Sequence, residues 1–85
     1  MNPITLQPGQ LSMMLGPGIL QIEFDPPGAG TGRGYYEIHY YDQDGFVNEI
    51  VGGQITSRFY FEYNMRHRYR FKVKNIGLNY PIRFR

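Results

Sequence analysis

Cysteine is absent from this sequence of 85 residues. The chain therefore has no disulfide framework, no thiolate ligand for a metal and no thiol nucleophile, so packing alone must hold the fold together. Hydrophobic residues make up 41% of the chain and the formal net charge is only +2, a composition typical of a folded globular protein. The length allows one core, and we expect residues 1–85 to form a single domain.

Long apolar runs are missing as well. No stretch of 18 apolar residues exists, so the sequence predicts no transmembrane helix. Residues 1–18 contain neither the basic start nor the small-residue cleavage site of a secretory signal peptide. We therefore expect no membrane partner, and a chain from the cytoplasm, from a virus or phage particle, or from a longer protein.

Residues that favour helices are scarce. Ala29 is the one alanine, whereas the chain has eight tyrosines, six phenylalanines, eleven glycines and six prolines. Aromatic residues favour strands, and frequent glycine and proline leave little room for helices. A helix over residues 54–76 is the alternative, but the apolar residues there alternate instead of recurring every three or four positions. The sequence predicts an all-β fold.

Eight short strands follow from the alternation of apolar and polar residues between turn-forming clusters. They cover residues 4–7, 11–15, 19–25, 35–41, 46–51, 55–63, 67–74 and 80–85. Pro81 has no N–H to donate, which favours an edge position for the last strand. Seven or eight strands at this spacing indicate a small antiparallel β-sandwich, immunoglobulin-like or jelly-roll-like, with a small barrel as the alternative.

Three connections have distinct chemistry. Residues 42–45, Asp-Gln-Asp-Gly, predict a hairpin turn because Asp-Gly readily adopts positive φ angles. Gly52 and Gly53 predict a second tight turn between two strands. Residues 28–34 have glycine at every second position, which predicts a loop with little side-chain packing and one charge, Arg33.

Positive charge is concentrated near the C-terminus. Residues 1–64 contain seven acids and two bases, whereas residues 65–85 contain seven bases and no acid. Five of these bases occupy alternate positions, so in a strand they share one face at intervals of about 6.6 to 7 Å. We call them the basic row: Arg66, Arg68, Arg70, Lys72 and Lys74. Residues between them, including Phe71 and Val73, are expected to point into the core.

Two interpretations of the basic row compete. A row of cations at this spacing is suited to a polyanion, since each neutralised phosphate releases counterions. Alternatively, acids on neighbouring strands neutralise the row as cross-strand ion pairs. The candidate acids are Glu23, Asp25, Glu37 and Glu62. A row of charge at a sheet edge also opposes aggregation.

Several tyrosines are expected on polar faces. Tyr35 and Tyr41 alternate with Glu37 and His39, and Tyr60 lies between charged residues of its own strand. Exposed tyrosine rings stack on sugars or bases, or anchor protein interfaces. The alternative is that these rings only brace cross-strand neighbours.

Catalytic and metal-binding patterns find little support. Residues 42–45 resemble the start of a calcium loop, but the later acidic ligand and the flanking helices are missing. His39 and His67 are expected in different strands with opposite faces. No serine has a residue near it in the sequence that would serve as its general base. We expect no enzyme activity, no cofactor and no metal.

The sequence thus favours a non-catalytic binding or assembly module that acts through a basic, tyrosine-rich sheet face. Its partner would be a protein or a second copy of itself in a homo-oligomer, for example in a virus particle. Nucleic-acid binding through residues 66–74 is the alternative, and carbohydrate binding by exposed tyrosines is a third. The candidate binding residues are Arg66, Arg68, Arg70, Lys72, Lys74, Arg33, Tyr35, Tyr41 and Tyr60.

Overall fold

The computed structural model describes residues 4–24, 33–56, 60–65, 70–78 and 80–85. Within these ranges the chain is all-β, and no helix is long and apolar enough to span a membrane. The strands are β1 (Ile4–Leu6), β2 (Ile19–Phe24), β3 (Arg33–Tyr41), β4 (Val47–Thr56), β5 (Tyr60–Asn64), β6 (Arg70–Asn75) and β7 (Ile82–Phe84).

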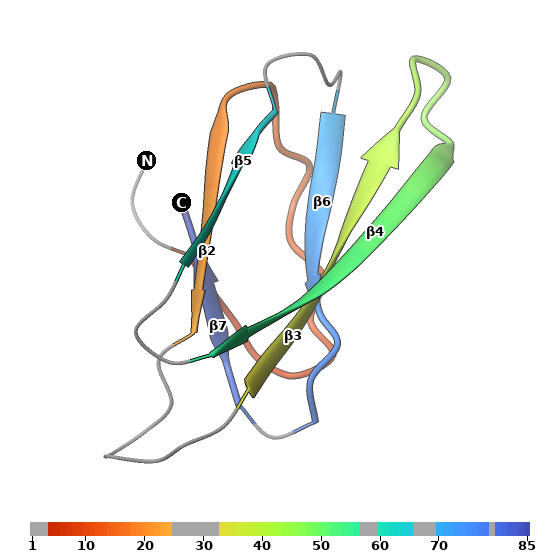
Figure 1. Ribbon diagram of the computed structural model, residues 1–85. Coiled ribbons are helices and arrows are strands. Elements are labelled where there is room, and N and C mark those ends of the chain that lie inside the picture. The colour runs from red at the N-terminus through yellow and green to blue at the C-terminus, as the bar shows by residue number, and fades with distance from the viewer. Residues whose placement is uncertain (1–3, 25–32, 57–59, 66–69, 79) are drawn as a thin grey trace.

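The strands form two antiparallel sheets, which confirms the predicted all-β class (Figure 1). One sheet has the order β1-β7-β2-β5 and the other has the order β4-β3-β6. Every pairing within them is antiparallel. Among the described strands, β3 and β4 are joined as a hairpin within one sheet. The β4–β5, β5–β6 and β6–β7 connections each pass from one sheet to the other.

One apolar core lies between the sheets, built from the inward residues of alternating strands. Burial alternates along β3, β6 and β7 as the sequence pattern predicts for strands with one wet side. The core residues from β1 to β7 are Leu6, Leu20, Ile22, Tyr36, Ile38, Tyr40, Ile55, Phe71, Val73, Ile82 and Phe84, joined by Leu15 and Met65. The inward assignment of Phe71 and Val73 is confirmed.

The predicted hairpin turn at residues 42–45 is confirmed. Gly45 adopts a φ of 86°, a left-handed conformation that glycine tolerates. The Asp42 carboxylate accepts hydrogen bonds from the backbone N–H groups of Asp44 (2.9 Å) and Phe46 (3.0 Å). This Asx-type arrangement fixes the turn between β3 and β4.

The second predicted tight turn, at Gly52 and Gly53, is wrong. Both glycines lie inside β4, which replaces the predicted strand 46–51 and the start of the predicted strand 55–63. Gly53 pairs with Tyr36 of β3. A Cβ at Gly53 would lie 2.5 Å from the Tyr36 hydroxyl oxygen, so glycine here makes room for a buried ring and does not bend the chain.

Two further strand predictions need correction. β7 lies between β1 and β2, so the edge position inferred from Pro81 is wrong. Pro81 precedes the first residue of β7, where no ladder donor is required.

Residues 11–15 form two isolated bridges to β6 in place of a regular strand. The cause is Ser12, whose side-chain oxygen accepts the Val73 N–H (2.9 Å) in place of a backbone carbonyl.

Other predictions fall partly outside the described residues. The glycine-rich loop over residues 28–34 ends early, since Arg33 and Gly34 already belong to β3. Residues 28–32 of that loop lie outside the described residues, as do residues 67–69 of the predicted strand 67–74. The described remainder of this predicted strand, residues 70–74, forms β6, which extends one residue further, to Asn75.

The two glycines of β4 provide a matched pair of substitutions. Gly53→Ala should destabilise the protein by about 1–3 kcal/mol, because the new methyl group displaces the buried Tyr36 ring. Gly52→Ala should change stability by less than about 0.5 kcal/mol, since its nearest neighbour would be 3.5 Å away. Urea unfolding of both variants measures the difference. Equal stability of the two would contradict the close packing of the Tyr36 ring against Gly53.

Candidate binding face

The outer side of the β4-β3-β6 sheet, turned away from the core, gathers most of the candidate residues. Outward positions of β3 and β6 alternate with the buried ones in both strands. We call this surface the basic face and define it by six residues: Arg33, Tyr35, Tyr41, Arg70, Lys72 and Lys74. The fold therefore brings Arg33, from the end of the glycine-rich segment, into the same sheet as Arg70, Lys72 and Lys74, the described part of the basic row.

The register between β3 and β6 sets the neighbours on this face. Lys74 lies opposite Glu37, Lys72 opposite His39 and Arg70 opposite Tyr41. Glu37 is oriented along its own strand, because its carboxylate contacts the His39 ring nitrogen at 3.1 Å. Within the described ranges, no carboxylate lies within 4 Å of the ammonium group of Lys72 or Lys74.

Other acids proposed to neutralise the basic row lie on the opposite sheet. Glu23 of β2 pairs with Arg83 of β7 at 3.3 Å. Glu62 of β5 accepts a hydrogen bond from the Gln21 amide (2.9 Å). These two acids are separated from β6 by the core. Asp25 lies outside the described residues. Among the described residues, the candidate acids therefore form no ion pair with Lys72 or Lys74.

An aromatic ring supports the middle of the basic face. The Lys72 ammonium lies 5.6 Å from the centre of the Tyr41 ring, within the range of a cation–π contact. Such a contact at a partly exposed site is worth about 0.5–1 kcal/mol. It places an ammonium group over an aromatic ring, an arrangement suited to an anionic partner with apolar groups.

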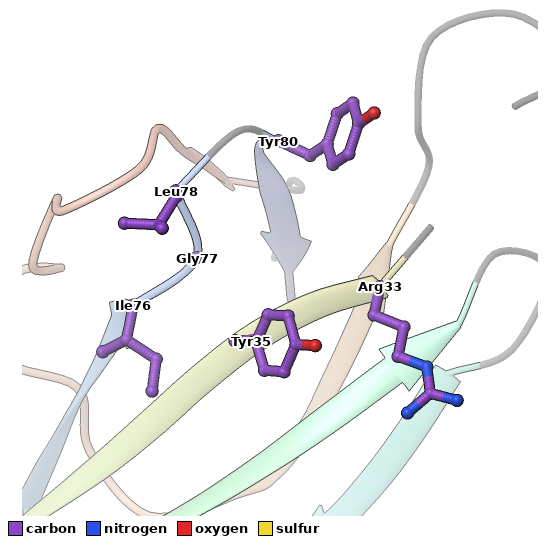
Figure 2. Close-up of a pocket in the computed structure, with 6 residues that line it drawn as sticks. All are labelled: Arg33, Tyr35, Ile76, Gly77, Leu78 and Tyr80. Atoms are coloured by element: carbon purple, nitrogen blue, oxygen red, sulfur yellow. The ribbon is translucent and has the colours of Figure 1, made fainter. Parts of the chain in front are cut away.

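A hollow of about 490 Å³ opens at one end of this face (Figure 2). Two lining residues, Arg33 and Tyr35, come from the start of β3, and the others come from the segment between β6 and β7. We call it the Tyr35 hollow, lined by Arg33, Tyr35, Ile76, Gly77, Leu78 and Tyr80. Its chemistry combines tyrosine rings, aliphatic side chains and one guanidinium group, which donates to the Gln54 side-chain oxygen at 2.7 Å.

Asn75 binds the backbone of residues that line the hollow. Its side chain is fully buried at the end of β6. The amide nitrogen donates to the backbone oxygens of Leu6 and Tyr80, each at 2.9 Å, and the amide oxygen accepts the Gly77 N–H at 2.9 Å. The adjacent Ile76 N–H donates to the Tyr35 backbone oxygen at 3.0 Å. These bonds hold Ile76 to β3 and fix the backbone of Gly77 and Tyr80 around the Asn75 side chain.

Three predicted residues are not among the six that define the basic face. Tyr60 is in β5 of the other sheet, opposite Glu23, so it is not part of the basic face. Arg66 and Arg68 lie outside the described residues.

Sequence reasoning treated residues 75–79 as a turn only and missed the wall of the hollow. The available signal was the apolar residues Ile76, Leu78 and Tyr80, which are unusual so close together in a connection.

In the described part of the chain, no group of three or more histidine, aspartate or glutamate side chains is placed to hold a metal ion. In comparisons with known proteins, no family model, no curated protein sequence and no solved structure matches this chain.

The Asn75 hydrogen bonds lead to a stability prediction. Asn75→Ala should lower the free energy of unfolding by about 2–4 kcal/mol, because two carbonyls and one N–H lose their partner in a mostly buried environment. Asn48→Ala, at an exposed position of β4, is the control and should change stability by less than about 0.5 kcal/mol. Chemical denaturation measures both, and a similar effect of the two substitutions would contradict the structural role of Asn75.

Proposed function

We propose that this protein is a non-catalytic binding or assembly module that acts through the basic face. Its partner is an acidic protein surface, on another protein or on a second copy of this chain. The observation that carries the proposal is the pair Lys72 and Lys74, which point outward from β6 with no carboxylate within 4 Å in the described residues. Cations without a carboxylate at ion-pair distance attract an anionic surface over several ångströms.

The composition of the face favours a protein partner. Tyrosine and arginine are the residues that most often dominate protein interfaces, because they combine apolar area with hydrogen-bonding groups. Tyr35, Tyr41 and Arg33 provide both on one sheet. Ile50 of β4 lies opposite His39 in the register and is exposed, which extends the apolar area of the same side.

We further propose that the two sheets form an immunoglobulin-like sandwich. The pairing of β2 with β5 and of β3 with β6 corresponds to the pairs B with E and C with F in that fold. One strand departs from the pattern, since β7 lies between β1 and β2 and not beside β6. Residues 10–15 take that place along β6 through backbone hydrogen bonds such as Ser12 N–H to Val73 O (2.8 Å).

Nucleic-acid binding is the second candidate function. It is favoured by the regular spacing of Arg70, Lys72 and Lys74 beside the Tyr41 ring, which together resemble a phosphate-contacting strand with a stacking platform. The affinity of such a complex would fall steeply with salt, because each phosphate contact releases counterions.

Binding of two labelled probes tests the proposal. Poly-L-glutamate stands for an acidic protein surface, and a mixed-sequence single-stranded oligonucleotide stands for nucleic acid. We expect poly-L-glutamate to bind, and the double variant Lys72→Gln/Lys74→Gln to bind it at least about tenfold more weakly with unchanged thermal unfolding. Fluorescence anisotropy at two salt concentrations measures both probes.

The double variant Arg83→Gln/Arg85→Gln is the matched control. It removes the same charge from the opposite sheet, where Arg83 pairs with Glu23, and we expect it to keep most of the affinity. Equal weakening by the two double variants would show that net charge alone drives binding and would refute a role for the basic face. Preference for the oligonucleotide at both salt concentrations would support the second candidate function.

A further inference from the structure

The tip of the β3–β4 hairpin presents an exposed aromatic ring on an ordered turn. The Phe46 side chain is 70% exposed. Its backbone is held by two hydrogen bonds, from its N–H to the Asp42 carboxylate (3.0 Å) and from the Asp42 N–H to its carbonyl (2.9 Å). An exposed ring on a fixed backbone loses little conformational entropy when it binds.

The same tip is acidic. Residues 42–50 contain Asp42, Asp44 and Glu49 and no lysine or arginine. Asp44 is exposed and lies two residues before Phe46. The tip therefore offers an exposed phenyl ring and, two residues before it, an exposed carboxylate.

The Tyr35 hollow has the complementary chemistry. Leu78 is 89% exposed at its margin, and Ile76 and Tyr35 are also exposed large side chains. Arg33 also lines the hollow, and Figure 2 shows its side chain on the other side of the Tyr35 ring from Ile76 and Leu78. A hollow of about 490 Å³ is within the usual size of sites that take a small molecule or a large side chain.

The two features lie at opposite ends of the same strand (Figure 1). β3 has nine residues from Arg33, at the hollow, to Tyr41, at the tip. At about 3.3 Å per residue the strand spans about 30 Å. The tip of one molecule therefore cannot enter its own hollow, and only a second copy can bring the two together.

We propose that the hairpin tip of one copy docks into the Tyr35 hollow of a second copy, with Phe46 against Tyr35, Ile76 and Leu78, and with Asp44 facing Arg33. This inference rests on the proposed assembly function and names its partner, a second copy of this chain. The contact joins different surfaces of the two copies, so each bound pair still presents one free tip and one free hollow. Such contacts build open chains or closed rings.

Two substitutions at exposed positions separate the halves of this contact. Phe46→Ala removes the ring from the tip and leaves the hollow intact. Leu78→Asp places a carboxylate at the hollow, where it repels Asp44, and leaves the tip intact. Because both side chains are largely exposed, we expect both variants to fold with unchanged thermal unfolding.

Light-scattering mass after gel filtration measures the outcome. We expect the wild-type mass to rise with concentration beyond that of two chains, and each variant alone to weaken association at least about tenfold. An equimolar mixture should form a complex of two chains and no larger species, because only the Leu78→Asp tip and the Phe46→Ala hollow remain functional. A monomeric mixture, or two variants that assemble like the wild type, would overturn the tip-to-hollow contact.

A charge exchange tests the Asp44 to Arg33 pairing separately. Asp44→Arg alone should weaken association, and adding Arg33→Asp in the same chain should restore it. No recovery in the double variant would overturn the pairing. If the Lys72→Gln/Lys74→Gln variant loses poly-L-glutamate binding while the tip and hollow variants assemble normally, the proposed function stands and this contact fails. If the tip and hollow variants lose assembly while the Lys72→Gln/Lys74→Gln variant still binds poly-L-glutamate, this contact stands and the role of the basic face fails.

Discussion

The buried amide of Asn75 is the contact on which the arrangement of this molecule depends. Its side chain joins β1, the end of β6 and the segment that leads to β7 through three hydrogen bonds. Its backbone adds two more, to Gln10 and from Gly9. Because an amide buried without partners costs several kcal/mol, these elements are stable together or not at all. The wall of the Tyr35 hollow is a direct consequence.

The second constraint is the separation of charge by the core. Glu23 and Glu62 face outward from the β1-β7-β2-β5 sheet, where they contact Arg83 and Gln21. Lys72 and Lys74 face outward from the other sheet, so no rearrangement of side chains brings those acids to them. Alternation along short strands thus places Lys72 and Lys74 on the same outer face of a protein with net charge +2. Charge at such a face guides association more than it stabilises the fold.

The predictable part of the structure follows from side-chain alternation. The outward positions of Tyr35 and Tyr41 and the inward positions of Tyr36 and Ile38 depend only on the period of two residues in a strand. The hairpin turn was predictable because the Asp42 carboxylate and Gly45 act locally.

The errors concern contacts that are distant in sequence. Gly53 was predicted to form a turn because two glycines in a row are typical of turns. Its actual role is to accommodate Tyr36, which is seventeen positions earlier in the sequence and lies in a neighbouring strand. Pro81 looked like an edge signal because the sequence does not reveal that β1 pairs with β7 on its far side. The hollow needed Asn75 to bind Leu6 and Tyr80, a contact that no local pattern indicates.

The central claim is that the basic face binds an acidic protein surface. The most direct test is the light-scattering mass of the unmodified chain over a range of concentrations at low and moderate salt, with and without a short mixed-sequence oligonucleotide. The account predicts a mass that rises with concentration, falls as salt screens the charges and is unaffected by the oligonucleotide. If the chain stays monomeric at every concentration and its mass shifts only with the oligonucleotide at low salt, assembly through the basic face is contradicted and nucleic-acid binding is favoured.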